Sequence, residues 1–280
     1  MTTALVLGGG GVAGIAWETG LLAGLADEGV DVTGADRLIG TSAGATVAAQ
    51  ITSGLTLDAL VERQLGPAHE INADLDVGRM TAMFGTALRR ATTALEMRAA
   101  IGQAALDASA VTEAARITVI EHRLPVHEWP AGRDIRIVAA DAESGEVRIF
   151  DGHDGVGMVD AVAASCAVPG VWPPVSIGER RYVDGGVRSS TNGDLAAGAD
   201  VILVLAPVID IPGIADPVVV EGFDAIDAAK LWLTPDEAST AAIGTNPLDP
   251  ATREPAVRAG RVQGRAAAAA VREIWPPSHH

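Results

Sequence analysis

The chain has 280 residues, 48% of them apolar, which is enough for the buried core of one large α/β domain or two small ones. It carries 36 acidic against 20 basic residues, a net charge of −16, so its field repels nucleic-acid phosphates and disfavours electrostatic docking on anionic membranes. The single cysteine, Cys166, excludes an intramolecular disulfide framework.

The sequence contains no uncharged apolar run of about 18 residues, the length that a membrane span needs. The amino terminus enters an apolar strand directly, without the basic region that opens a secretory signal. We therefore expect a soluble protein located in the cytoplasm.

The first predicted element is a buried strand at Ala4–Leu7, and four consecutive glycines, Gly8 to Gly11, follow it. Apolar residues then recur at helical spacing from Ile15 to Glu28, and Gly29 is expected to end that helix. A run of glycines is costly in chain entropy and usually answers a need for exposed backbone. The loop is therefore a candidate site for a phosphate or an oxyanion.

This loop, from Gly9 to Gly14, fits the G-x-G-x-x-G pattern of dinucleotide-binding proteins. That interpretation needs an acidic residue at the end of the second strand. Here Asp36 precedes the second predicted strand, Arg37–Ile39, which runs instead toward Ser42. We therefore favour oxyanion binding, because neighbouring parallel strands would place the loop amides beside this serine.

The segment Gly40–Gly44 reads G-x-S-x-G and lies between the strand Arg37–Ile39 and an alanine-rich helical stretch, Ala45–Ile51. This layout predicts a nucleophile elbow, a sharp turn that crowds the serine and therefore requires glycine on both sides. The first free N–H groups of the helix, beginning at Ala43, would favour negative charge beside Ser42. The alternative is an ordinary strand–turn–helix junction with a capping serine.

Helical patterns dominate the next part of the chain, at Leu57–Leu65, from Val77 to Leu88, at Thr92–Leu106 and onward to Val119. The apolar residues of the second of these helices, Met80, Met83, Phe84, Ala87 and Leu88, follow helical spacing. Because methionine adapts to varied apolar shapes, this face is a candidate cover for an acyl chain. Plain core packing is the favoured explanation.

Strands return in the second half, at Asp134–Ala140, Glu146–Phe150, Arg181–Val183 and Val201–Leu205. Gly145 predicts a hairpin between the first two. A helix is expected at Val159–Ala164, and another at Gly260–Glu273 near the end of the chain. The stretch from Pro207 to Pro255 is expected to be irregular.

A serine hydroxyl is a weak nucleophile and needs a base. His153, in a glycine-flanked loop, is one candidate, and Asp184, directly after a predicted strand and before two glycines, is the other. A carboxylate on such an uncrowded turn can approach a hydroxyl closely. A local role is also open for each, as a solvated loop histidine or as a turn aspartate that binds nearby N–H groups.

Four segments in this order resemble the patatin-like phospholipases, a family of lipid acyl hydrolases that use a Ser–Asp dyad. They are the glycine loop Gly8–Gly14, the elbow Gly40–Gly44, the long segment Ala164–Pro174 and Asp184–Gly186. The resemblance covers about residues 4 to 206. It implies a three-layer α/β/α fold with a mainly parallel central sheet, and it makes Cys166 a packed residue.

The resemblance also implies the roles of individual residues. Ser42 would be the nucleophile and Asp184 the base, and the amides of Gly9, Gly10 and Gly11 would bind the oxyanion. Two positions depart from the family pattern. Ala13 stands where family members usually carry Arg or Lys, and the usual Asn-x-Pro after Asp-Gly-Gly is reduced to Asn192-Gly193. The head group of the substrate therefore stays open.

From these observations we expect a single patatin-like domain over residues 1–280, in which 207–280 have no assigned role. The expected function is hydrolysis of carboxylic esters of lipids, of the phospholipase A, lysophospholipase or esterase type. The alternatives are acyl transfer to an alcohol or carrier, or a weakly catalytic lipid-binding regulatory protein. A lipid or other acyl ester is the expected partner, with transient membrane-surface contact left open. Nucleic acid, metal and other cofactors are not expected.

Overall fold

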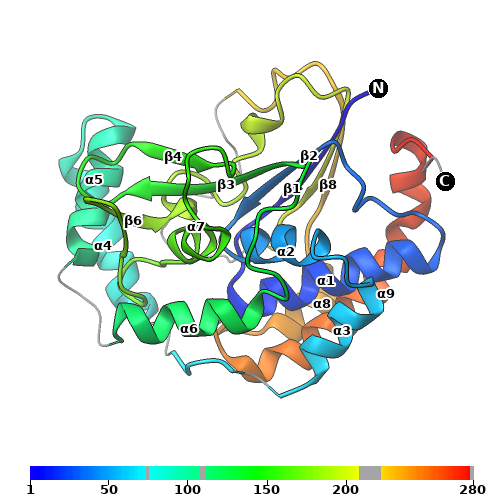
Figure 1. Ribbon diagram of the computed structural model, residues 1–280, viewed down its shortest axis with the longest axis horizontal. Helices are drawn as coiled ribbons and strands as arrows, with labels where there is room; N and C mark the ends of the chain where they lie inside the picture. The colour runs from blue at the N-terminus through cyan, green and yellow to red at the C-terminus, as the bar shows by residue number, and fades with distance from the viewer. Residues whose placement is uncertain (68, 74–75, 107–110, 208–221, 278–280) are drawn as a thin grey trace.

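The computed structural model describes residues 1–67, 69–73, 76–106, 111–207 and 222–277 (Figure 1). Its strands are β1 (Thr3–Leu7), β2 (Arg37–Thr41), β3 (Asp134–Asp141), β4 (Val147–Phe150), β5 (Val175–Ile177), β6 (Arg180–Asp184), β7 (Val201–Leu205) and β8 (Ala229–Leu233). Its α-helices are α1 (Gly11–Asp27), α2 (Ala43–Ile51), α3 (Leu57–Leu65), α4 (Val77–Arg90), α5 (Ala94–Leu106), α6 (Glu113–Arg123), α7 (Met158–Ser165), α8 (Glu237–Ile243) and α9 (Arg253–Ile274).

The strands form one sheet in the order β5-β6-β3-β2-β1-β7-β8, and β4 also pairs with β3. Strands β3, β2, β1, β7 and β8 run parallel. The remaining pairs, β3 with β4, β3 with β6 and β5 with β6, are antiparallel. The sheet is thus a parallel core with an antiparallel side, and the hairpin predicted around Gly145 is confirmed.

Both faces of the sheet are covered (Figure 1). In β3, Ala139 packs with a core that includes residues of α1, α2, α7 and α9, whereas the next residue, Ala140, packs with residues of α4 and α5. The opposite face of the central strands packs against the segment around Ala196 and against Phe223. Because successive side chains of a strand point to opposite faces, this alternation requires two covering layers. The expected three-layer α/β/α fold is confirmed.

Some elements differ from the sequence-based expectation. β5 was not predicted, and β8 and α8 lie in the stretch expected to be irregular. The short strands β5 and β8 form by pairing with β6 and β7, partners that a local pattern does not reveal. Helix α6 begins after its capping residue Thr112, and positions 107–110 of the helical region expected there lie outside the described residues.

The carboxy-terminal helix α9 packs directly on α1, and Figure 1 shows the two helices side by side. Glycines on both helices form the contact. A Cβ at Gly264 would overlap the carbonyl of Leu21, and one at Gly24 would overlap the carbonyl of Arg261. The two backbones therefore touch at positions where only hydrogen fits, which attaches α9 to the helix that begins in the glycine loop.

Replacing Gly264 by alanine is expected to lower the free energy of unfolding by about 3 kcal/mol, because α1 and α9 must separate to admit the methyl group. Urea denaturation would measure the change. The matched control is Gly78→Ala in α4, where the added carbon meets ordinary contact distances only. That change should leave stability equal or raise it by about 0.5–1 kcal/mol. Equal effects at the two positions would contradict the packing argument.

No helix in the described ranges is long and apolar enough to cross a membrane.

Candidate active site

Ser42 lies at a sharp turn between β2 and α2 and has φ 52° and ψ −111°, a backbone conformation that side chains rarely adopt. The flanking glycines are required by space. A Cβ at Gly40 would lie 2.6 Å from the Cα of Ala45, and one at Gly44 would overlap the carbonyl of Leu7. The turn therefore has the strain and crowding of a nucleophile elbow. Both flanking glycines are explained as the sequence predicted.

Two residues of the Ala164–Pro174 segment hold the elbow in place. The N–H of Ser42 donates to Ser165 Oγ at 2.9 Å, and that hydroxyl donates to the carbonyl of Val138 at 2.6 Å. Cys166 Sγ donates to the carbonyl of Ser42 at 3.1 Å. Cys166 is buried, and this burial raises the pKa of its thiol. Its packed role agrees with expectation, whereas the clamp formed by Ser165 was not predicted.

The strand register brings Asp184 next to the elbow. Thr41 pairs with Val138, and the next residue of β3, Ala139, pairs with Asp184. Ser42 follows Thr41 and is therefore level with Asp184 across β3. Neighbouring strands lie about 4.8 Å apart, so the two backbones are separated by roughly two strand spacings. Both side chains line the same cavity, of about 150 Å³.

The Asp184 carboxyl is buried, with one oxygen held and the other left open. Oδ1 accepts the Gly186 N–H at 2.7 Å, and Oδ2 accepts no hydrogen bond from the residues that the structure describes. Burial raises the pKa of Asp184 to about 6, against smaller lowering effects from the Ser42 side chain, the Gly186 amide and Arg116. Ser42 is thus near enough to influence Asp184, although no hydrogen bond of ordinary geometry joins the two side chains. Such contacts often shorten only when substrate binds.

The glycine loop lies beside the serine and uses some of its amides internally. Gly8 N–H donates to the carbonyl of Leu205, and Gly9 N–H donates to the carbonyl of Ser190 at 2.7 Å. In the described part of the chain, no acceptor receives the N–H of Gly10, Gly11 or Ala43. These three amides are therefore free to face a ligand, whereas Gly9 is engaged with Ser190.

The rest of the cavity wall is mainly apolar. Met80 and Phe84 of α4 line it, so the face expected to pack in the core also borders Ser42 and Asp184. Leu88, placed on the same face by its spacing, is 63% exposed and takes no part. Pro247 and Leu248, from the carboxy-terminal stretch that had no assigned role, complete the wall.

Three further residues bear on the sequence-based expectations. Ala13 is buried, and its N–H donates to the carbonyl of Pro247. Asn192 is buried, and its Nδ2 donates to Thr41 Oγ1 at 3.0 Å, just before the elbow. His153, the rival base, lies exposed in the loop after β4 and does not line the cavity. Asn192 was noticed only as a fragment of a family motif, and its support for β2 was not predicted.

Glu18 of α1 is a fully buried carboxyl beneath the glycine loop. Its Oε1 accepts the Gly8 N–H at 2.9 Å, a proton shared with the carbonyl of Leu205, and its Oε2 has no partner among the described residues. Burial raises the pKa of Glu18 well above 4.5, although the Gly8 bond acts in the opposite direction. The protonated carboxyl therefore supports the loop at a pH at which an exposed glutamate is charged.

A Glu18→Gln variant should keep the Gly8 bond and lose the titration. A carboxyl with a raised folded-state pKa stabilises fully below 4.5, its unfolded value, and this stability is lost as pH rises toward the folded pKa. The free energy of unfolding of the variant should therefore exceed that of the wild type by a margin that grows by about 1.4 kcal/mol per pH unit in this window. Urea denaturation from about pH 5.5 upward would measure it. The control is Glu62→Gln, at an exposed position. If the difference in free energy of unfolding between Glu18→Gln and wild type stayed constant with pH, the role of Glu18 would be contradicted.

Within the described residues, no group of three His, Cys, Asp or Glu side chains is placed to hold a metal ion.

Comparison with known proteins identifies the family. The model of the patatin-like phospholipase family matches residues 5–197, and the chain belongs to that family. No curated protein matches the chain.

Two solved structures are similar to it. VipD from Legionella pneumophila matches with 12% identity and a TM-score of 0.45, over 96% of this chain and 66% of that one. The type III effector protein ExoU matches with 17% identity and a TM-score of 0.44, over 96% of this chain and 53% of that one. The chain thus spans less than two thirds of either protein, and at this level of similarity neither structure bears on its activity.

Proposed function

We propose that the protein is a serine acyl hydrolase that cleaves carboxylic esters of lipids, of the phospholipase A, lysophospholipase or esterase type. The observation that carries the proposal is that Ser42, on its elbow, and Asp184, whose Oδ2 has no partner among the described residues, line one mainly apolar cavity. The family assignment supports the lipid substrate class. The apolar wall around Met80 and Phe84 suits an acyl chain.

In the first step, Ser42 Oγ forms a bond to the ester carbonyl carbon while Asp184 Oδ2 takes the hydroxyl proton. The carbonyl electron pair moves to oxygen, which the amides of Gly10, Gly11 and Ala43 receive. The bond to the alcohol then breaks, and the proton on Asp184 passes to the leaving oxygen. Gly9 was also expected to donate, but it would first have to release Ser190.

In the second step, water attacks the acyl-enzyme and Asp184 takes its proton. The second tetrahedral intermediate collapses, the fatty acid leaves, and the proton returns to Ser42 Oγ. A base with a pKa of about 6 is ionised at neutral pH and still accepts a proton readily, so Asp184 suits both steps.

The direct test is labelling with a fluorophosphonate probe, followed by product analysis. An activated serine should react, and the label should map to Ser42. A passive lipid-binding pocket would not label, and this result would contradict the proposal. Products formed from a chain-length series of esters, with and without an alcohol acceptor, separate hydrolysis from acyl transfer. Acyl transfer without release of free acid would replace hydrolysis by the alternative function.

We also propose that residues 207–280 complete a single domain with the motif-bearing part. Pro247 and Leu248 line the cavity, and the carbonyl of Pro247 accepts the N–H of Ala13. The glycine contact between α1 and α9 further supports this assignment. A cytoplasmic location stays a proposal based on composition and on the single cysteine.

A further inference from the structure

Arg116 of α6 is a buried cation, two of whose guanidinium nitrogens have no hydrogen-bond acceptor in the described part of the chain. It is 2% exposed, and its Nε and Nη1 donate to none of the residues that the structure describes. Its neighbour on the same helix, Arg123, donates instead to both carboxylate oxygens of Glu70, at 2.8 and 2.7 Å. Buried charged donors are normally paired, and one left unpaired is costly. The free N–H groups of Arg116 therefore point to an absent acceptor.

Trp172 orders this guanidinium without using its donors. The guanidinium carbon lies 4.1 Å from the centre of the Trp172 ring, a cation–π distance. Burial lowers the pKa of Arg116 to about 9, so the group is still charged at neutral pH. The positive charge is thus held in place by an aromatic face and stays available for an anionic oxygen.

Arg116 faces a very small cavity that also borders the nucleophile. The cavity has a volume of about 10 Å³, and its wall includes Gly11, Ser42, Ala43, Arg116 and Trp172. A volume of this size holds about one water-sized atom, so a single oxygen fits and a phosphate group does not. Gly11 and Ala43, whose amides have no acceptor among the described residues, line the same cavity.

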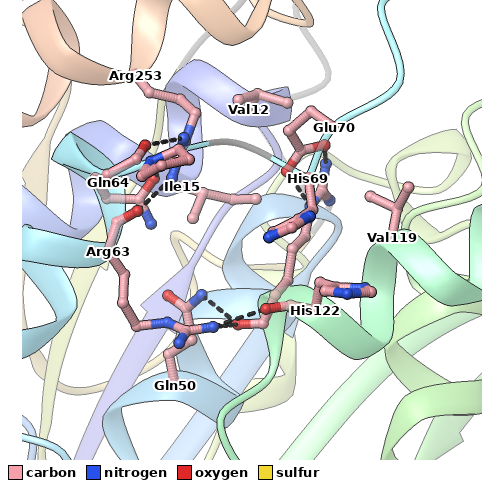
Figure 2. Close-up of a pocket in the computed structure, with 13 residues that line it drawn as sticks. Val12, Ile15, Gln50, Arg63, Gln64, His69, Glu70, Val119, His122 and Arg253 are labelled. Carbon is pink, nitrogen blue, oxygen red and sulfur yellow. Dashed lines mark hydrogen bonds and ion pairs between the residues drawn. The ribbon is translucent and has the colours of Figure 1, made fainter.

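This small cavity lies between two larger ones. It shares Ser42 and Gly11 with the apolar cavity of the dyad. It also shares Val12, Ile15 and Arg123 with a cavity of about 350 Å³, which Figure 2 shows. In that cavity Arg63 and Arg253 donate to backbone carbonyls, and Arg123 is paired with Glu70. The three arginines that line the cavity of Figure 2 therefore already have acceptors, in contrast to Arg116.

We propose that Arg116 is a catalytic residue that donates to the oxyanion of the tetrahedral intermediate, together with the amides of Gly11 and Ala43. This inference rests on the proposed function of Ser42 and Asp184. As Ser42 Oγ bonds to the carbonyl carbon, the displaced electron pair collects on the carbonyl oxygen, which occupies the small cavity. Arg116 keeps its protons throughout. When the bond to the alcohol breaks, the pair returns to re-form the carbonyl and the interaction weakens.

The test compares Arg116→Gln and Arg116→Lys with wild type on p-nitrophenyl butyrate, a neutral ester. Removal of one oxyanion donor typically lowers kcat by about 10² to 10³. We expect this loss for Arg116→Gln with little change in KM, and a partial recovery for Arg116→Lys. Affinity for an alkyl trifluoromethyl ketone, which adds to the serine and forms an oxyanion, should fall by a similar factor. The control is Arg258→Gln, which changes an exposed arginine paired with Glu254 on the surface of α9.

Rates are counted per mole of enzyme that reacts with a fluorophosphonate, so a poorly folded variant does not imitate a loss of kcat. Wild-type kcat in Arg116→Gln would overturn the proposal, and so would a loss confined to anionic esters, which would make Arg116 a head-group residue. A lower kcat with unchanged ketone affinity would also overturn it, because the effect would then be structural. Wild-type protein that neither labels nor turns over would contradict the dyad itself.

Discussion

Replacing Ser42 by alanine is expected to lower kcat for ester hydrolysis by about 10⁵ to 10⁶, because no acyl-enzyme can then form. The elbow geometry makes this a clean change. The strain at φ 52° belongs to the backbone, and alanine has the same Cβ as serine, so the turn keeps its shape. The hydrogen bond from the residue 42 N–H to Ser165 also survives, since only the hydroxyl is removed.

The measurement is hydrolysis of p-nitrophenyl esters by purified wild type and Ser42→Ala, with fluorophosphonate labelling of both. Ser190→Ala is a matched control. Its side chain also lies at the cavity, but the contact of Ser190 to the glycine loop is made by its backbone carbonyl. That control should keep activity within about threefold, as a change outside the reacting groups does. Turnover by Ser42→Ala near the wild-type rate would rule out Ser42 as the nucleophile.

Replacing Asp184 by asparagine is expected to lower kcat by about 10⁴, the size of effect seen when a catalytic carboxylate of a serine hydrolase is removed. The amide is almost isosteric, and its Oδ1 can still accept the Gly186 N–H. What it loses is the ability to accept a proton from Ser42. Equal rates for Asp184→Asn and wild type would exclude this carboxyl as the base.

The pH profile gives an independent check on the same residue. The base must be ionised, and burial raises the pKa of Asp184 to about 6. The kcat/KM of wild type should therefore fall tenfold per pH unit below about pH 6 and level off above it. If kcat/KM instead fell only below about pH 4, where an ordinary exposed aspartate titrates, the base would not be buried as described.

Asp184→Asn should lower kcat without lowering the free energy of unfolding. A carboxyl whose folded pKa is raised contributes stability fully below 3.8, its unfolded value, and this contribution is lost as pH rises to about 6. Asparagine does not ionise, so the variant avoids this loss. At pH 7.5 the free energy of unfolding of Asp184→Asn should be at least that of wild type, and higher by up to about 3 kcal/mol. An inactive but equally stable or more stable protein separates a lost base from a damaged fold.

Several parts of the fold were predictable because their signals are local. The strand–glycine–helix pattern at Leu7 to Gly14 and the elbow at Gly40–Gly44 each need a few neighbouring residues, and the structure explains both flanking glycines of the elbow by direct overlap. The strand β7 is a continuous apolar run of the kind that two-sided burial in a parallel sheet requires. Helix α3 has the predicted bounds, with its capping residue Thr56 outside it.

Other features depend on contacts between distant segments. The clamp of Ser165 on Ser42 joins residues 123 positions apart, and the bond from Asn192 to Thr41 joins residues 151 apart. The sequence around Arg116 does not distinguish it from Arg123. Only the fold shows that Arg123 is paired with Glu70, whereas Nε and Nη1 of the buried Arg116 have no acceptor among the residues that the structure describes. The engagement of the Gly9 amide by Ser190 was likewise invisible in the sequence.

The sequence by itself determined the chemical parts of this protein: a serine on a turn too tight for side chains, a loop of bare amides and an aspartate at a strand end. It could do so because backbone conformation at glycine and serine is a short-range property. The tertiary structure alone decided their environment. Burial and strand register set how far Asp184 lies from Ser42, what pKa it has, which amides are free and which cation lies at the same cavity as Ser42, since these depend on solvent exclusion by segments far away in the chain.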